Sequence, residues 1–91
     1  MSEQIDNLRA TLEELQEELR SVESLDPETR KVIEEAVDKI ESALHDEDVE
    51  AMEHQSLIEQ FREATEEFEK SHPGLTRIVG NLMDGLGQMG I

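Results

Sequence analysis

Apolar residues recur at alternating intervals of three and four along the first quarter of the chain. The series is Ile5, Leu8, Leu12, Leu15, Leu19 and Val22. This spacing is typical of the narrow seam of a coiled coil, where two of every seven residues face a partner helix. It predicts a helix over about residues 3–24 that contacts one or two neighbouring helices and exposes its other faces.

A second amphipathic segment follows after a very short connection. Asp26 is a favourable N-cap residue and Pro27 suits the first position of a helix, so we expect a helix over residues 27–45. Its apolar face is wider and contains Val32, Ile33, Ala36, Val37, Ile40, Ala43 and Leu44. So short a connection favours an antiparallel hairpin, with Leu12 and Leu15 buried between its two helices.

The acidic run after His45 predicts an interruption over about residues 46–55, because acidic side chains are unfavourable at a helix C-terminus. Ser56 and Glu59 have capping-box spacing and predict a third helix over residues 56–71. Its apolar residues are Leu57, Phe61, Ala64 and Phe68. No glycine or proline lies between Pro27 and Pro73, so one long bent helix is the alternative.

The triplet Ser71, His72 and Pro73 predicts a hinge, because a proline disfavours the helical conformation of the preceding residue and can itself begin a helix. A fourth helix is expected over residues 73–88. Its broad apolar face predicts an interaction surface, formed by Leu75, Val79, Leu82, Leu86 and Met89. Glycines at positions 80, 85 and 87 each weaken a helix by about 1 kcal/mol relative to alanine. We therefore expect this face to be buried, either in the protein's own core or against a second chain.

Composition assigns these segments to a single all-α domain over residues 1–91, with an antiparallel helical hairpin and two further helices in a bundle-like or coiled-coil-like arrangement. The chain is rich in good helix formers, has only two aromatic residues and lacks cysteine. No stretch approaches the ~20 apolar residues of a membrane span, and the first residues do not resemble a signal peptide. We expect a cytoplasmic protein.

The net charge is −16, and only Arg77 and Asp84 carry a formal charge from His72 onward. Such acidity disfavours binding to nucleic acid or to anionic membrane. Solvated helix faces explain most of it. Mimicry of nucleic acid by the acidic surface is an alternative based on charge alone.

No pattern typical of a catalytic site is present, and we expect neither catalytic nor cofactor-binding nor metal-binding residues, and no cofactor. Glu69 and His72 have the three-residue spacing of helical di-iron sites, but such sites need a second copy of the motif and two more glutamates. The acidic run at Asp46 lacks the glycine and glutamate of a calcium loop. A metal-carboxylate site in an oligomeric bundle is therefore an alternative function.

Four short stretches resemble a family of short bacterial proteins catalogued as a domain of unknown function. They are LRATLEELQEEL at residues 8–19, SL at 56–57, FEKSHPGL at 68–75 and MGI at 89–91. Members of that family often carry prolines where this chain has residues 46–55, which favours the interruption. The resemblance implies a fold and no activity.

The most consistent hypothesis is a small, non-catalytic helical interaction and oligomerisation protein. The coiled-coil seam and the apolar fourth helix both favour association. We expect a homodimer, with room for a further protein partner.

Overall fold

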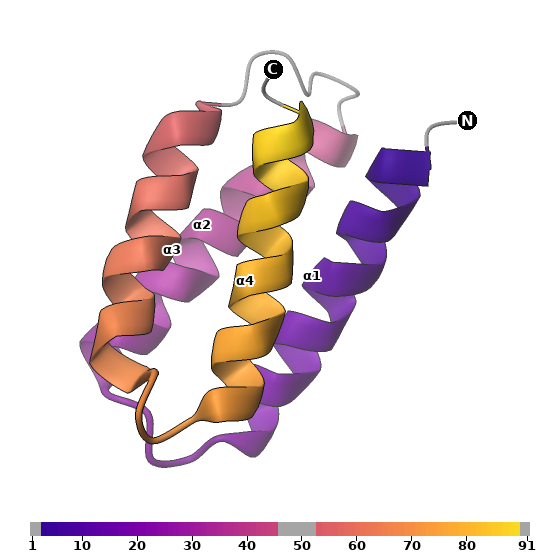
Figure 1. The fold of residues 1–91 in the computed structure, drawn as a ribbon. Helices are drawn as coiled ribbons and strands as arrows, with labels where there is room; N and C mark the ends of the chain where they lie inside the picture. Colours follow the sequence, from indigo (N-terminus) through magenta and orange to yellow (C-terminus); the bar gives the residue numbers. More distant parts are fainter. Residues whose placement is uncertain (1–2, 46–52, 90–91) are drawn as a thin grey trace.

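The computed structural model describes residues 3–45 and 53–89, and every regular element within these two ranges is an α-helix. The helices are α1 (Glu3–Ser21), α2 (Pro27–His45), α3 (His54–Phe68) and α4 (Pro73–Met89). They pack into one bundle (Figure 1), so the predicted all-α class is confirmed. None of the described helices is long and apolar enough to cross a bilayer.

The start of α2 agrees with the sequence pattern in detail. The backbone N–H of Thr29 donates to Asp26 Oδ2 at 3.3 Å, and Pro27 is the first helical residue. Asp26 therefore satisfies one of the free N–H groups of the first turn. The preceding helix ends at Ser21, three residues before the expected boundary.

The start of α3 differs from the prediction. The helix begins at His54, and the residue before it, Glu53, makes no side-chain capping bond. Instead the backbone N–H of Leu57 donates to Glu53 O at 3.0 Å. Ser56 therefore lies inside the helix, and the capping box predicted for Ser56 and Glu59 is wrong.

The predicted interruption over residues 46–55 lies mostly outside the described residues, since positions 46–52 are among those left undescribed. Its two ends are described: α2 ends at His45 and α3 begins at His54, and these helices pack side by side. They are therefore two separate helices, which rules out the single bent helix.

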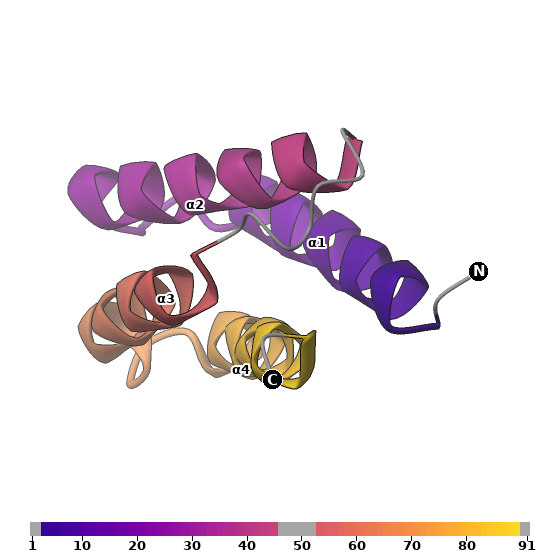
Figure 2. The same ribbon diagram turned by 90° about the horizontal axis from the view of Figure 1, so that it is seen from above.

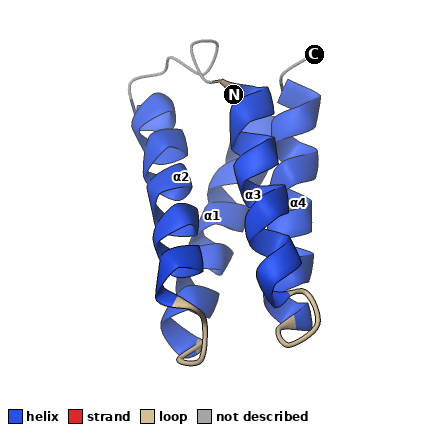
Figure 3. Cartoon of the chain, turned by 90° about the vertical axis from the view of Figure 1, so that its left-hand side faces the viewer, coloured by secondary structure: helices blue, strands red, loops and turns tan. Residues whose placement is uncertain are grey.

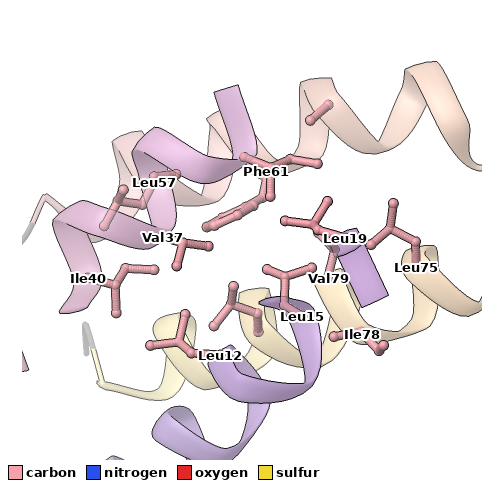
Figure 4. Packing of buried hydrophobic residues seen from close by; sticks show 14 of the residues in the cluster. Leu12, Leu15, Leu19, Val37, Ile40, Leu57, Phe61, Leu75, Ile78 and Val79 are labelled. Carbon is pink, nitrogen blue, oxygen red and sulfur yellow. The ribbon is translucent and has the colours of Figure 1, made fainter. Parts of the chain in front are cut away.

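The four helices form a ring in which each contacts two neighbours, in the order α1, α2, α3, α4 and back to α1 (Figure 2). The core lies inside this ring, and Figure 4 shows part of it. The largest of the fully buried side chains are Leu8, Leu15, Ile33, Ile40, Phe61, Phe68, Leu75, Val79, Leu82 and Leu86. From the predicted apolar face of α2, Val32 alone is exposed, at 40%.

The main partner of α1 is α4 rather than α2, which corrects the expected hairpin packing. Leu12 and Leu15 are buried as predicted, but the α1–α4 interface is the most extensive in the bundle and the α1–α2 interface the least. The reason lies in the residues that flank the apolar seam. Where α1 and α2 face each other, both helices carry polar and charged side chains next to the leucines. A groove therefore remains between the two helices.

Two close approaches join α1 to α4. A Cβ atom placed on Gly85 would lie 3.7 Å from Leu8 Cδ1, and one on Gly74 would lie 3.4 Å from Glu18 Oε2. The carboxylate of Glu18 thus lies beside the first turn of α4, which has no acidic residue of its own. A negative charge at the positive end of a helix dipole is stabilising.

Candidate functional site

A long groove lies between α1 and α2 on the described surface. Its upper section, nearer the N-terminus of α1, encloses about 800 Å³. It is lined from Arg9 to Gln16 on α1 and from Asp38 to His45 on α2. Its lower section encloses about 420 Å³. Because Gln16 and Asp38 line both sections, the groove is continuous along most of the two helices.

The floor of the groove is apolar but well covered. It consists of Leu12 and Leu19 from α1 and Val37 and Leu44 from α2. None of the four is more than 5% exposed. The groove therefore presents little apolar surface as it stands, and more would appear if α1 and α2 moved apart.

The walls of the groove are polar and mixed in charge. On α1 they are formed by Arg9, Glu13, Gln16 and Arg20; on α2 they are formed by Arg30, Glu34, Asp38, Glu41, Ser42 and His45. One hydrogen bond spans the groove, from Gln16 Nε2 to Glu41 Oε1 at 2.9 Å. This bond is exposed to solvent, so it contributes little to holding the helices together.

The lower end of the groove is closed by Arg30. Its guanidinium donates from Nη1 to Leu19 O at 2.6 Å and from Nη2 to Val22 O. These carbonyls lie at the C-terminus of α1, where backbone oxygens have no partner within the helix and where positive charge is favourable. Arg30 therefore caps α1 from the first turns of α2 and ties the two helices together at this end.

The predicted hinge residues form the turn between α3 and α4. The backbone N–H groups of Ser71 and His72 both donate to Phe68 O, and Thr76 donates to His72 O. His72 Nε2 also lies 3.4 Å from Ser24 Oγ in the α1–α2 loop. Figure 3 shows these two loops at the same end of the bundle. The turn is therefore held by backbone bonds to α3 and α4 and by the contact of His72 with the α1–α2 loop.

The predicted interaction surface of the fourth helix lies inside the molecule. Leu75, Val79, Leu82 and Leu86 are each fully buried in the core formed with the other helices. The side chain of Met89 is outside the described residues. These four leucine and valine side chains are therefore covered by the chain itself, and another molecule would have to contact other residues.

Glu69 and His72, whose spacing suggested a di-iron motif, lie beyond the end of α3, and Glu69 is exposed. The third helix, predicted to extend to residue 71, ends at Phe68. Within residues 3–45 and 53–89, no three His, Cys, Asp or Glu side chains gather closely enough to hold a metal ion. His54 Nε2 is buried and has no hydrogen-bond partner in the same part of the chain.

Sequence reasoning missed the groove, although the pattern contains a signal for it. Polar residues at positions 9, 13, 16 and 20 follow directly after the seam leucines and repeat at the same alternating intervals. They form a polar stripe beside the apolar seam. In a heptad with the seam at positions a and d, Arg9 and Gln16 occupy e positions, which flank the seam and face the edge of a partner helix, and Glu13 and Arg20 occupy the neighbouring b positions. The stripe therefore indicates a polar margin on one side of α1.

A family model described as a domain of unknown function, DUF4404, matches residues 8–91. The match includes all of α2, α3 and α4 and most of α1. Neither a curated protein nor a solved structure matches the chain.

Proposed function

Because the chain belongs to the DUF4404 family of unknown function, we propose its function from its own geometry: it is a small, non-catalytic helical interaction protein. Its docking site is the groove between α1 and α2, and the occupant is an amphipathic helix of a partner protein. The proposal includes association of the chain with a second copy of itself. The observation that carries it is the groove along the α1–α2 interface, which is the least extensive interface of the bundle.

The dimensions of the groove fit a helical occupant. It runs from Arg9 to Arg20 on α1, which at 1.5 Å per residue corresponds to roughly 17 Å, or about three turns of helix. Amphipathic helices commonly bind by inserting apolar side chains into a groove between two helices. Leu12 and Leu44 would receive such side chains once the exposed bond between Gln16 and Glu41 is broken.

Charge favours an occupant that is basic overall. The net charge of −16 attracts cationic partners over distance and raises their association rate. In the upper section, Glu13, Asp38 and Glu41 can pair with lysine or arginine, while Arg9 requires an acidic residue at one end. The acidic and basic residues of the walls would thus orient the bound helix as well as attract it.

A capture experiment with a matched control tests the docking site. The full chain carrying Glu13→Lys and Glu41→Lys reverses charge on both walls of the groove. Its control carries Glu14→Lys and Glu66→Lys, which make the same total change at exposed positions outside the groove. We expect a helical protein bound by the wild type and the control to lose binding to the groove variant.

The same complex should protect the backbone amides of α1 and α2 from hydrogen exchange more than those of α3. Equal binding by the groove variant and the control, or protection confined to α3 and α4, would overturn the proposed docking site. Circular dichroism of both variants would establish that each retains its helical content.

A further inference from the structure

The outer side of α4 forms a second groove with α3, away from the core. It encloses about 670 Å³ and contains Ile58 and Arg62 of α3 together with Gly80, Met83 and Gly87 of α4. A Cβ atom placed on Gly80 or Gly87 would have nothing within 4 Å. Packing within the chain therefore does not require glycine at either position, and the backbone of α4 is open to close approach by another helix.

The charges on this surface are few and opposite. Arg77 and Asp84 are the charged residues of α4, and both are exposed along this groove. In the described part of the chain an ion pair joins Lys31 to Glu35, and none includes Arg77 or Asp84. The other helices expose many glutamates, so this face is where two copies with a net charge of −16 each repel one another least.

The arrangement of these two charges is self-complementary. In a two-fold symmetric dimer the same surface of each copy meets itself, so that a contact from one residue to another occurs twice. Arg77 and Asp84 are seven residues apart, about two helical turns. In an antiparallel pair of α4 helices centred between Gly80 and Asn81, Arg77 of each copy lies opposite Asp84 of the other.

From this complementarity we infer that the α3–α4 groove binds α4 of a second copy as an antiparallel, two-fold symmetric helix pair. Gly80 lies at the crossing, where the two backbones approach most closely. Arg62, on the neighbouring helix of the same groove, provides a second base near the Asp84 of the second copy. The inference rests on the proposed role in helix-mediated association, and it identifies the surface through which two copies of the chain associate.

A contact between two helices of this length is small. Interfaces below about 1,200 Å² are typical of weak or transient complexes. We therefore expect a reversible dimer. Added salt should strengthen it at first, because screening weakens the repulsion between two strongly acidic chains over distances longer than about 10 Å at 0.1 M.

Charge reversal and charge exchange test the geometry. Sedimentation equilibrium of the full chain would measure the dimer dissociation constant of the wild type, Arg77→Asp, Asp84→Arg and the double variant. Each single reversal places like charges opposite each other and should raise the constant at least tenfold, equivalent to about 1.4 kcal/mol. The double variant exchanges the two charges and should restore the dimer. Lys39→Asp and Glu14→Arg make the same charge changes on exposed parts of α2 and α1 and should leave it intact.

A substitution at Gly80 separates the dimer contact from stability of the fold. Gly80→Gln improves helix propensity and extends into open space in a single copy, so it should raise the melting temperature of the dilute protein. The same side chain obstructs the crossing point and should weaken the dimer. A loss of dimer together with a rise in melting temperature cannot result from unfolding.

A monomeric wild type at every concentration, a double variant that fails to restore the dimer, or a dimer that Gly80→Gln leaves intact would each overturn this inference. A monomer that still binds a partner through Glu13 and Glu41 would overturn it and leave the proposed docking site standing. If the α4 dimer forms as inferred but the Glu13→Lys, Glu41→Lys variant binds its partner as well as the wild type does, the dimer inference stands and the docking site proposed between α1 and α2 is overturned.

Discussion

The helix α1 has two neighbours and contacts them by different means. Toward α4 it presents buried leucines, with Leu8 against Gly85 and Glu18 beside the first turn. Toward α2 it is joined by an exposed hydrogen bond from Gln16 and by the capping contacts of Arg30. Burying a leucine side chain contributes about 1.5–3 kcal/mol, whereas a typical hydrogen bond adds about 0.5–1.5 kcal/mol. The comparison shows that helices adjacent in the sequence, such as α1 and α2, need not pack more tightly than helices distant in the sequence, such as α1 and α4.

Removing residues 73–91 should have the largest effect, because it deletes the main partner of α1. The deletion uncovers Leu8, Leu15 and Phe68, which are almost completely buried in the intact bundle. We expect loss of cooperative thermal unfolding and binding of a hydrophobic dye, with recovery when a peptide of residues 73–89 is added. A shortened chain that melts cooperatively as a soluble monomer would show that α4 lies outside the core.

Leu15→Ala should have the next largest effect. Leu15 is 0% exposed, and replacing a buried leucine by alanine costs about 2–5 kcal/mol. Urea titration followed by circular dichroism would measure the change in the free energy of unfolding. The neighbouring Glu14→Ala, at an exposed position of the same helix, should change it by less than about 0.5 kcal/mol. Similar values for the two would mean that the seam does not face a core.

Arg30→Ala should have an intermediate effect, because it removes the link at the closed end of the α1–α2 groove. Hydrogen bonds to a charged group contribute about 1.5–3 kcal/mol, and the carbonyls of Leu19 and Val22, in and just after the last turn of α1, lose their donor. Faster hydrogen exchange at the C-terminal turn of α1 should accompany the loss. Lys31→Ala is the control, since its pair with Glu35 is exposed and worth a few tenths of a kcal/mol. No difference between the two variants would contradict the capping role of Arg30.

Gln16→Ala should have the smallest effect on stability, within about 0.5 kcal/mol, because the bond to Glu41 that it removes is exposed. Its effect should appear instead as increased hydrogen exchange of α1 and α2 on both sides of the groove. A loss of stability comparable with that of Leu15→Ala would mean that the α1–α2 interface is as firmly closed as the α1–α4 interface.

Much of the fold was predictable because short-range patterns determine it. The alternating leucines of α1 and the Asp26–Pro27 start of α2 identify helices without reference to the rest of the chain. The start of α3 was less predictable, because a backbone bond from Leu57 replaces the side-chain cap that Ser56 suggested.

The pairing of helices was not predictable from connection length. A short link brings α2 beside α1, but the polar stripes at the groove keep their apolar surfaces from closing. The α1–α4 interface joins residues more than fifty positions apart, such as Leu8 and Gly85, so no local sequence pattern predicts it. The two grooves depend on that arrangement in space, so the sequence predicted the burial of the apolar face of α4 but not the position of either groove.

The ring of helices closes through its first and last members, and this has a consequence for the order of folding. Contacts between distant residues form only after a long loop has closed, at an entropic cost that local hairpins avoid. The α3–α4 hairpin can therefore form early, whereas α1 acquires its main partner late. During synthesis, the leucines of α1 remain without their main partner until residues 73–89 have been made. We expect the nascent protein to depend at that stage on its dense acidic charge, which keeps unfinished chains apart until the bundle closes.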